Sequence, residues 1–403
     1  MNFDYSVPVP LLRFLGACVY GDAGAYYEGL GEAERAELEA QGKKYGFRAW
    51  FYRYLCDVLP ETKKAEYQNL YRTMQIKAMM GERELKRLYG VLTEYDLRFV
   101  PIKGADLAFR VYPDAALRVF GDWDIWFHPD DCERALVVLK DDGWTLPEQY
   151  ADKPDALREK TSDHHFARRR RGSYEMEPHF TLTNFNGCDP HELWEGVCPC
   201  DGVRHVLSPE MNMLMLSRHA ASRSYYHASL PKLLTDMAMV MRSGKVDFSR
   251  LHQLANRFHL PYPGDLLAAF PEFFPAEVLR TLDADQEKAA VFRSLFDCRG
   301  SLGEPEDVSL VLSRCEACGN VMGGLLERIR KHDPATIRRI YRLPDNGAWG
   351  RVAWAYLCWF WTRSWSARVW LQRKKKLREY GRIVESIESR KPCPDKTLRN
   401  QKG

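Results

Sequence analysis

The sequence lacks a membrane-spanning segment. The longest apolar run, residues 352–361, is about half of the roughly 20 residues that a helix needs to cross a bilayer, and Arg351 and Arg363 flank it. The start of the chain also lacks a basic segment followed by an apolar run, so it does not resemble a secretory signal. These two absences predict a cytoplasmic protein.

The sequence also lacks the pattern of a disulfide framework. It has 11 cysteines, and in a chain without a secretory signal we expect reduced thiols in the core or in loops. A zinc site is the alternative. The nearest group of ligands is Cys188, His191, Cys198 and Cys200, while Cys315 and Cys318 form the only Cys-x-x-Cys and have no second pair at finger-like spacing.

The sequence also lacks a large excess of positive or negative charge. The net charge of +4 is small for 403 residues, so it neither requires nor excludes a nucleic-acid partner. Apolar residues make up 45% of the chain and charged residues 28%, which excludes general disorder. The length predicts two or three packed units, and no internal repeat marks a solenoid.

The order of helical and strand-like segments predicts an α+β protein. Helices are expected over residues 10–95, 105–111, 130–143 and 208–260, with a further pattern over 308–329, and strands over 97–102, 122–127 and 174–180. Pro178 favours an edge strand or a strand end for the last of these. We therefore divide the chain into an N-terminal helical region (1–95), a core that contains the predicted strands (96–205), a helical domain (206–330) and an aromatic and basic tail (331–403).

Asp122 and Asp124 alternate with Trp123 and Ile125 in a short predicted strand. Because side chains alternate across a strand, we expect both carboxylates on one face and the apolar residues on the other. Two neighbouring carboxylates repel each other unless a cation lies between them or one is protonated. Their hard oxygens suit Mg²⁺ or Mn²⁺. Such a pair is more often simply exposed to solvent, so the neighbouring residues in the sequence determine whether a metal site is the better interpretation.

Upstream residues add a candidate phosphate site. Lys103 and Gly104 lie between a predicted strand and a predicted helix, where backbone N–H groups favour an anion and glycine permits close approach. Arg118 precedes the aspartates by four residues, and its guanidinium can form paired hydrogen bonds with a phosphate or clamp one of the acidic ligands. We predict that these three residues bind a nucleotide.

These motifs together resemble the uncharacterised nucleotidyltransferases of the polymerase-β-like superfamily. The resemblance covers roughly residues 67–260 and is carried by 101–107, Tyr112-Pro113, Arg118, 122–125, 177–180, 207–210, His219 and 233–236. The sequence departs from the superfamily's better-known pattern in having Lys103-Gly104 instead of Gly-Ser, Trp123 between the aspartates and Pro178 on a strand. These departures affect the choice of nucleotide more than metal binding.

The resemblance implies two-metal transfer of a nucleotidyl group from an NTP such as ATP, in a mixed sheet flanked by helices. Asp122 and Asp124 would bind both Mg²⁺ or Mn²⁺ ions, and Glu177 would be the third acidic ligand and candidate general base. Glu175 shares the face of Glu177 and is its rival. We favour Glu177, since it stands two residues before His179 as in the matching motif.

Other polar residues are expected near the substrate or behind the ligands. His179 belongs to the same strand motif as Glu177, and His164 is expected to contact phosphate or acceptor unless it is simply solvated. His219 and Asp236 fall on the inward faces of two predicted helices. We predict that they hydrogen-bond across these helices, with direct contact to the substrate as the alternative.

The sequence does not identify the acceptor or the role of the C-terminal tail. A small metabolite, a natural-product intermediate, a protein or tRNA would each supply a hydroxyl-type acceptor. The tryptophans between 354 and 370 and the basic residues 373–376 suit a buried core, RNA, an anionic membrane surface or a partner protein. A non-catalytic nucleotide-binding or RNA-binding scaffold with the same fold is the alternative function. The sequence does not predict the oligomeric state.

Overall fold

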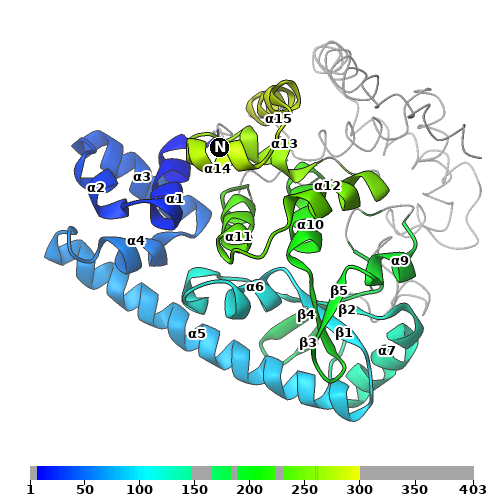
Figure 1. Cartoon of the computed structure of the whole chain (residues 1–403). Coiled ribbons are helices and arrows are strands. Elements are labelled where there is room, and N and C mark those ends of the chain that lie inside the picture. The colour runs from blue at the N-terminus through cyan, green and yellow to red at the C-terminus, as the bar shows by residue number, and fades with distance from the viewer. Residues whose placement is uncertain are drawn as a thin grey trace, which may run out of the picture. The chain divides into compact units, whose positions relative to one another are not determined.

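A computed structural model places helices around a mixed sheet (Figure 1). It describes residues 7–146, 166–182, 185, 188–222, 230–258, 260 and 262–299. These residues belong to one compact unit, Met1–Ser301. The candidate His164, the predicted helix at 308–329, the Cys315–Cys318 pair and the aromatic and basic tail lie outside the described residues.

The N-terminal part of the chain is helical, as predicted. Its helices are α1 (Val9–Tyr20), α2 (Ala23–Glu28), α3 (Glu32–Tyr45), α4 (Arg48–Leu55) and α5 (Glu61–Glu94). Helix α5 is 34 residues long because no proline interrupts it, and it packs against α4 near its start. Its last turns bury Leu85, Leu88 and Leu92 at helical spacing. In Figure 1, α5 runs from the N-terminal helices to the sheet.

The sheet is mixed, which confirms the predicted α+β class. Its strands are β1 (Phe99–Ile102), β2 (Trp123–Phe127), β3 (Arg169–Arg171), β4 (Tyr174–His179), β5 (Val197–Asp201) and β6 (Arg204–Leu207), in the order β3-β4-β2-β1-β6-β5. Strand β2 pairs antiparallel with β1 and parallel with β4. Between the strands lie α6 (Gly104–Arg110), η1 (Ala115–Leu117), η2 (Pro129–Asp131), α7 (Cys132–Asp141) and α9 (Pro190–Trp194).

Pro178 agrees with one of the two alternatives that the sequence left open. It is the last residue but one of β4, which is a strand end, whereas β4 is not an edge strand because it lies between β3 and β2. The proline is tolerated because β3 pairs only with residues 174–176, so it leaves the second half of β4 uncovered. The Pro178 carbonyl accepts a hydrogen bond from the backbone N–H of Phe166 at 2.8 Å, which uses the one hydrogen-bonding group that proline retains.

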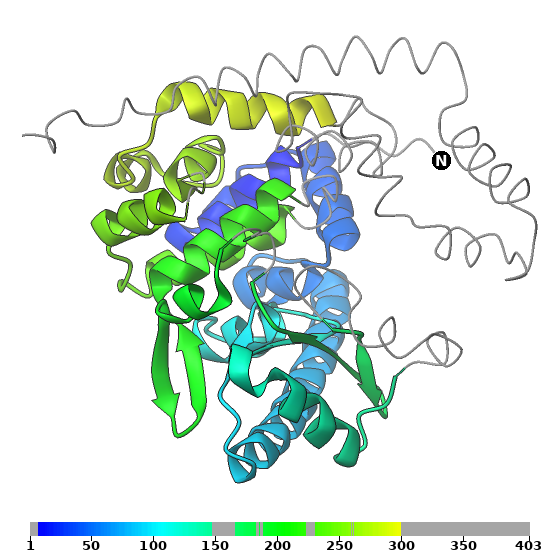
Figure 2. The same ribbon diagram turned by 90° about the vertical axis from the view of Figure 1, so that its right-hand side faces the viewer.

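Helices cover both faces of the sheet (Figure 2). On one face, Trp123, Ile125 and Phe127 of β2 pack with the end of α5 and with α7 in one apolar cluster. Trp126 points to the other face and belongs to a larger cluster that extends into the N-terminal and C-terminal helices. The alternation along β2 therefore assigns its side chains to two cores.

The first helix after the sheet begins where the sequence predicts, at Pro209, and the described helices beyond residue 260 were not predicted. The helices after the sheet are α10 (Pro209–Ser222), α11 (Leu230–Arg242), α12 (Phe248–Arg257), α13 (Pro263–Ala268), α14 (Ala276–Thr281) and α15 (Gln286–Arg299). Ser208 caps α10 by accepting a hydrogen bond from the backbone N–H of Met211 at 3.2 Å. Helix α10 packs against α11 and α12. Within the described part of the chain, every helix is too short or too polar to span a membrane.

Candidate active site

The paired strands β2 and β4 bring two carboxylates side by side. In their parallel register Asp124 is the direct partner of Glu177, and Trp126 is the partner of His179. Ligand atoms of Asp124, Glu177 and His179 all lie within 4.8 Å of one another. This register places Glu177, rather than Glu175, beside Asp124.

Asp124 is almost fully buried, with 6% of its surface exposed, and holds two polar partners. Its Oδ1 lies 2.8 Å from Nζ of Lys103 and 2.9 Å from Nε2 of the buried His179. Burial alone would raise the pKa of Asp124, but the Lys103 charge and the His179 hydrogen bond outweigh it and hold the pKa well below its usual value. Asp124 is therefore ionised and fixed in orientation.

Asp122 precedes β2 and is linked to β4 through an arginine that the sequence did not single out. Arg168 donates from Nη2 to Asp122 at 2.8 Å and to Glu177 at 2.5 Å, and from Nη1 to Glu175 at 2.9 Å. Burial raises the pKa of Asp122, and repulsion from Asp124 and Glu177 adds to this, while Arg168 opposes it. One guanidinium thus connects three carboxylates.

Asp236 and Arg118 form a buried ion pair close to this cluster. Arg118 donates from Nε and Nη2 to the two oxygens of Asp236 at 2.6 and 2.8 Å, and the Tyr112 hydroxyl donates to Oδ1 at 2.6 Å. This geometry ties α11 to the loop before β2. It gives Asp236 partners other than the predicted His219, which lies partly buried on α10. The ion pair with Asp236 also occupies the guanidinium of Arg118, which the sequence analysis had assigned to nucleotide binding.

The turn between β1 and α6 places the charge of Lys103 beside Asp124 and packs Gly104 against Phe120. Lys103 has φ +54° and ψ −129°, a conformation that costs a residue with a side chain of the order of 1–3 kcal/mol. The conformation directs Nζ to Asp124, so Lys103 has a partner inside the acidic cluster. A Cβ on Gly104 would lie 2.6 Å from Cβ of Phe120. Glycine is therefore required at position 104 by this side chain, a reason that the sequence alone did not reveal.

A cationic pocket adjoins the carboxylates. It encloses about 230 Å³ between the α3–α4 turn, the loop after η1 and α11, and its charged lining residues are Lys43, Arg48, Arg118 and Lys232. Burial lowers the pKa of Lys232, and the Arg118 charge lowers it further, while Asp236 and Asp122 oppose this. Lys232 was missed by our sequence reasoning. Its spacing of four residues from Asp236 on one helix face was the available signal.

A second group of ligand atoms lies away from the site. Among the described residues, His128, Asp130 and His191 are the other group whose ligand atoms fall within 4.8 Å of one another. Arg98 already approaches two of them, with Nη1 at 3.3 Å from His128 and Nη2 at 3.4 Å from Asp130. Neither described group includes a cysteine. Cys198 and Cys200 are exposed free thiols on β5, so the described geometry does not support the zinc alternative.

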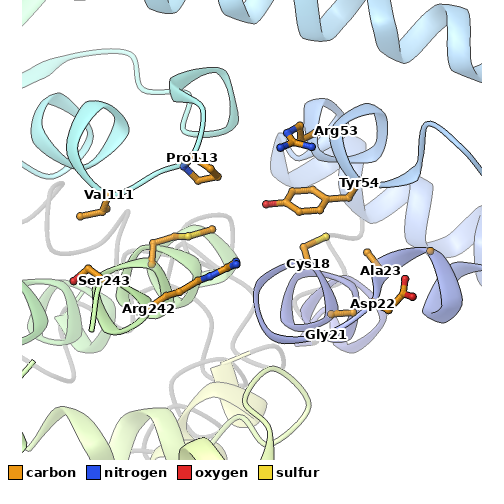
Figure 3. Close-up of a pocket in the computed structure, with 13 residues that line it drawn as sticks. Cys18, Gly21, Asp22, Ala23, Arg53, Tyr54, Val111, Pro113, Arg242 and Ser243 are labelled. Carbon is orange, nitrogen blue, oxygen red and sulfur yellow. The ribbon is translucent and has the colours of Figure 1, made fainter. Parts of the chain in front are cut away.

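A cavity of about 700 Å³ lies elsewhere, among the N-terminal helices, the segment after α6 and the end of α11. Figure 3 shows Cys18 and Tyr54 on one side of it and Pro113 and Arg242 on the other. None of the carboxylates described above lines this cavity. Its size therefore does not identify it as the reaction centre.

Comparison with known proteins agrees with the geometry. The family model described as "Uncharacterised nucleotidyltransferase" matches residues 53–264, a span that runs from α4 to α13 and contains each carboxylate of the candidate site. No curated protein and no solved structure matches the chain.

Proposed function

The chain belongs to this uncharacterised nucleotidyltransferase family, and from that premise we propose a Mg²⁺-dependent transfer of NMP from an NTP to a hydroxyl-type acceptor. One observation carries the proposal, namely the meeting of three carboxylates: Asp124 on β2 is the register partner of Glu177 on β4, and Arg168 links Glu177 to Asp122. In the reaction, an acceptor oxygen bonds to the α-phosphorus, the bond to the bridging oxygen breaks, and pyrophosphate leaves.

The residues present fit a divalent metal. Asp122, Asp124 and Glu177 offer only hard oxygen atoms, which suit Mg²⁺ or Mn²⁺ better than softer metals. Asp124 is kept ionised by Lys103 and His179, so it is ready to act as a ligand. Two divalent cations held by these carboxylates would activate the acceptor hydroxyl and stabilise the leaving pyrophosphate.

Protein cations complete the proposed substrate site. Lys232 lies close enough to Asp122 for their charges to interact, and it lines a pocket with no acidic side chain among its lining residues. We assign this pocket to a phosphate-bearing part of the substrate because an NTP carries its negative charge there. Lys103 holds Asp124 in place, and Glu177 is the candidate acceptor of the proton from the attacking hydroxyl.

The Arg118–Asp236 pair positions this machinery. It fixes the loop before Asp122 against α11, the helix that carries Lys232. Because both partners are buried and Tyr112 adds a further hydrogen bond, the ion pair keeps the carboxylates and the cationic pocket at a fixed distance and orientation. Arg118 and Asp236 are therefore positioning residues in this proposal.

Incubation with radiolabelled NTPs, Mg²⁺ and a cell extract tests the proposal and identifies the acceptor class, whether metabolite, protein or tRNA. We expect one class of molecule to become labelled by the wild-type protein and not by an Asp122→Asn/Asp124→Asn variant. Asp141→Asn, an exposed change at the end of α7, is the matched control and should label normally. Equal labelling by the double variant would show that these carboxylates do not act.

A further inference from the structure

We propose that Arg168 is a built-in counter-cation of the metal site, which leaves the carboxylates when Mg²⁺ and nucleotide bind together. The inference rests on the proposed function, since it concerns the same carboxylates. It assigns Arg168 a role in coupling the two ligands: the protein without nucleotide would bind a divalent cation weakly, and nucleotide would strengthen that binding.

The contacts of Arg168 place its charge among the metal-ligand candidates. Its Nη2 donates to Asp122 and Glu177, its Nε donates to Glu177 at 3.1 Å, and its Nη1 donates to Glu175. These three carboxylates come from the loop before β2 and from β4, so the guanidinium lies where their negative charges converge. A divalent cation needs the same oxygen atoms, and like charges disfavour its arrival beside Arg168.

The side chain of Arg168 has room to move. It is 39% exposed, whereas the following residue, Arg169, is buried and paired with Met176 in the β3–β4 ladder. Rotation of the Arg168 side chain therefore leaves the sheet intact. A guanidinium binds phosphate through paired hydrogen bonds, so the triphosphate of an incoming nucleotide offers Arg168 a replacement for the carboxylates.

Arg170 provides a matched control in the same segment. It also forms an ion pair with Glu175, but it has no contact with Asp122 or Glu177 among the described interactions, and its side chain is 57% exposed. Removing Arg170 changes the total charge as much as removing Arg168 does. Only the loss of Arg168 removes a guanidinium from Asp122 and Glu177.

The test measures Mn²⁺ binding by electron paramagnetic resonance on the full chain without nucleotide. We expect Arg168→Gln to bind Mn²⁺ about tenfold more tightly than the wild type, since a neighbouring positive charge is gone, and Arg170→Gln to bind it as the wild type does. A non-hydrolysable NTP analogue should strengthen Mn²⁺ binding by the wild type and do so less in Arg168→Gln. Equal Mn²⁺ affinity in Arg168→Gln and the wild type would overturn the proposal.

A second variant keeps the test decisive if Arg168→Gln does not fold, as judged by its melting temperature. Arg168→Met also removes the charge and keeps an unbranched side chain, so it should bind Mn²⁺ more tightly than the wild type, and wild-type affinity would contradict the proposal. Different results would show that the proposed function itself is wrong. In that case the wild type would bind Mn²⁺ no better with any NTP analogue, and Asp122→Asn/Asp124→Asn would leave Mn²⁺ binding unchanged.

Discussion

At the scale of single residues, the site depends on basic side chains that hold carboxylates in defined positions. Lys103 and His179 fix Asp124, and Arg168 joins Asp122 to Glu177. The sequence predicted the carboxylates because their alternation on a strand is a local pattern. It missed Arg168, since a position in a four-arginine run does not reveal which guanidinium turns to the aspartates.

Lys232 gives a prediction about pH. Its pKa is lowered chiefly by burial, so the ammonium loses its proton below the ordinary lysine range of about 10.4. Only the protonated form attracts phosphate, and NTP affinity should therefore fall as the pH rises through this lowered pKa. Calorimetric titration of an NTP analogue across the alkaline range checks this. In Lys232→Met the affinity should be lower at neutral pH and should lack that decline.

At the scale of elements, two features determine the geometry of the candidate site. They are the turn from β1 into α6 and the ion pair between α11 and the loop before β2. The sequence located these elements through periodicity, caps and prolines. It could not predict that Arg118 and Asp236, 118 positions apart, would pair. Such a contact follows from the packing of α11 on the core, which local patterns do not encode.

Gly104→Ala should destabilise the fold by about 1–3 kcal/mol, because the added Cβ would overlap Phe120 in a packed region. Gly81→Ala is the comparison within a helix, since its Cβ meets no atom within 4 Å there. That change should be neutral or stabilising by about 0.5–1 kcal/mol. Denaturant unfolding followed by circular dichroism measures both. Equal effects of the two substitutions would argue against the packing role of Gly104.

Asp236→Asn should cost about 3–5 kcal/mol, because it leaves the buried Arg118 charge without its partner. Tyr112→Phe removes only one hydrogen bond and should cost about 1 kcal/mol. The same unfolding experiment compares them. If Asp236→Asn keeps wild-type stability but abolishes transfer, Asp236 contacts substrate and the positioning role is wrong.

At the scale of the whole molecule, each residue assigned to the reaction lies in the unit Met1–Ser301. The family match supports the same region, since it covers residues 53–264. The α+β class was predictable, because a run of helices followed by strands and then helices allows few arrangements, and the mixed sheet was predictable from the family resemblance. The predicted division at residues 95, 205 and 330 stays a prediction.

A chain ending at residue 301 should therefore keep Mg²⁺-dependent NTP binding. Calorimetry with the truncated and full-length proteins checks this, and we expect their affinities to agree within about threefold, a difference of less than 1 kcal/mol. A much weaker affinity in the truncated chain, with its melting curve unchanged, would show that residues 302–403 contribute to the nucleotide site.

The position of the label in the nucleotide tests nucleotidyl transfer most directly. Wild-type protein, Mg²⁺ and extract are incubated in parallel with an NTP labelled at the α-phosphate and with one labelled at the γ-phosphate. We predict that the acceptor takes up the α label and not the γ label, and that Asp122→Asn/Asp124→Asn abolishes the uptake. Transfer of the γ label alone would show phosphoryl transfer and contradict the central claim.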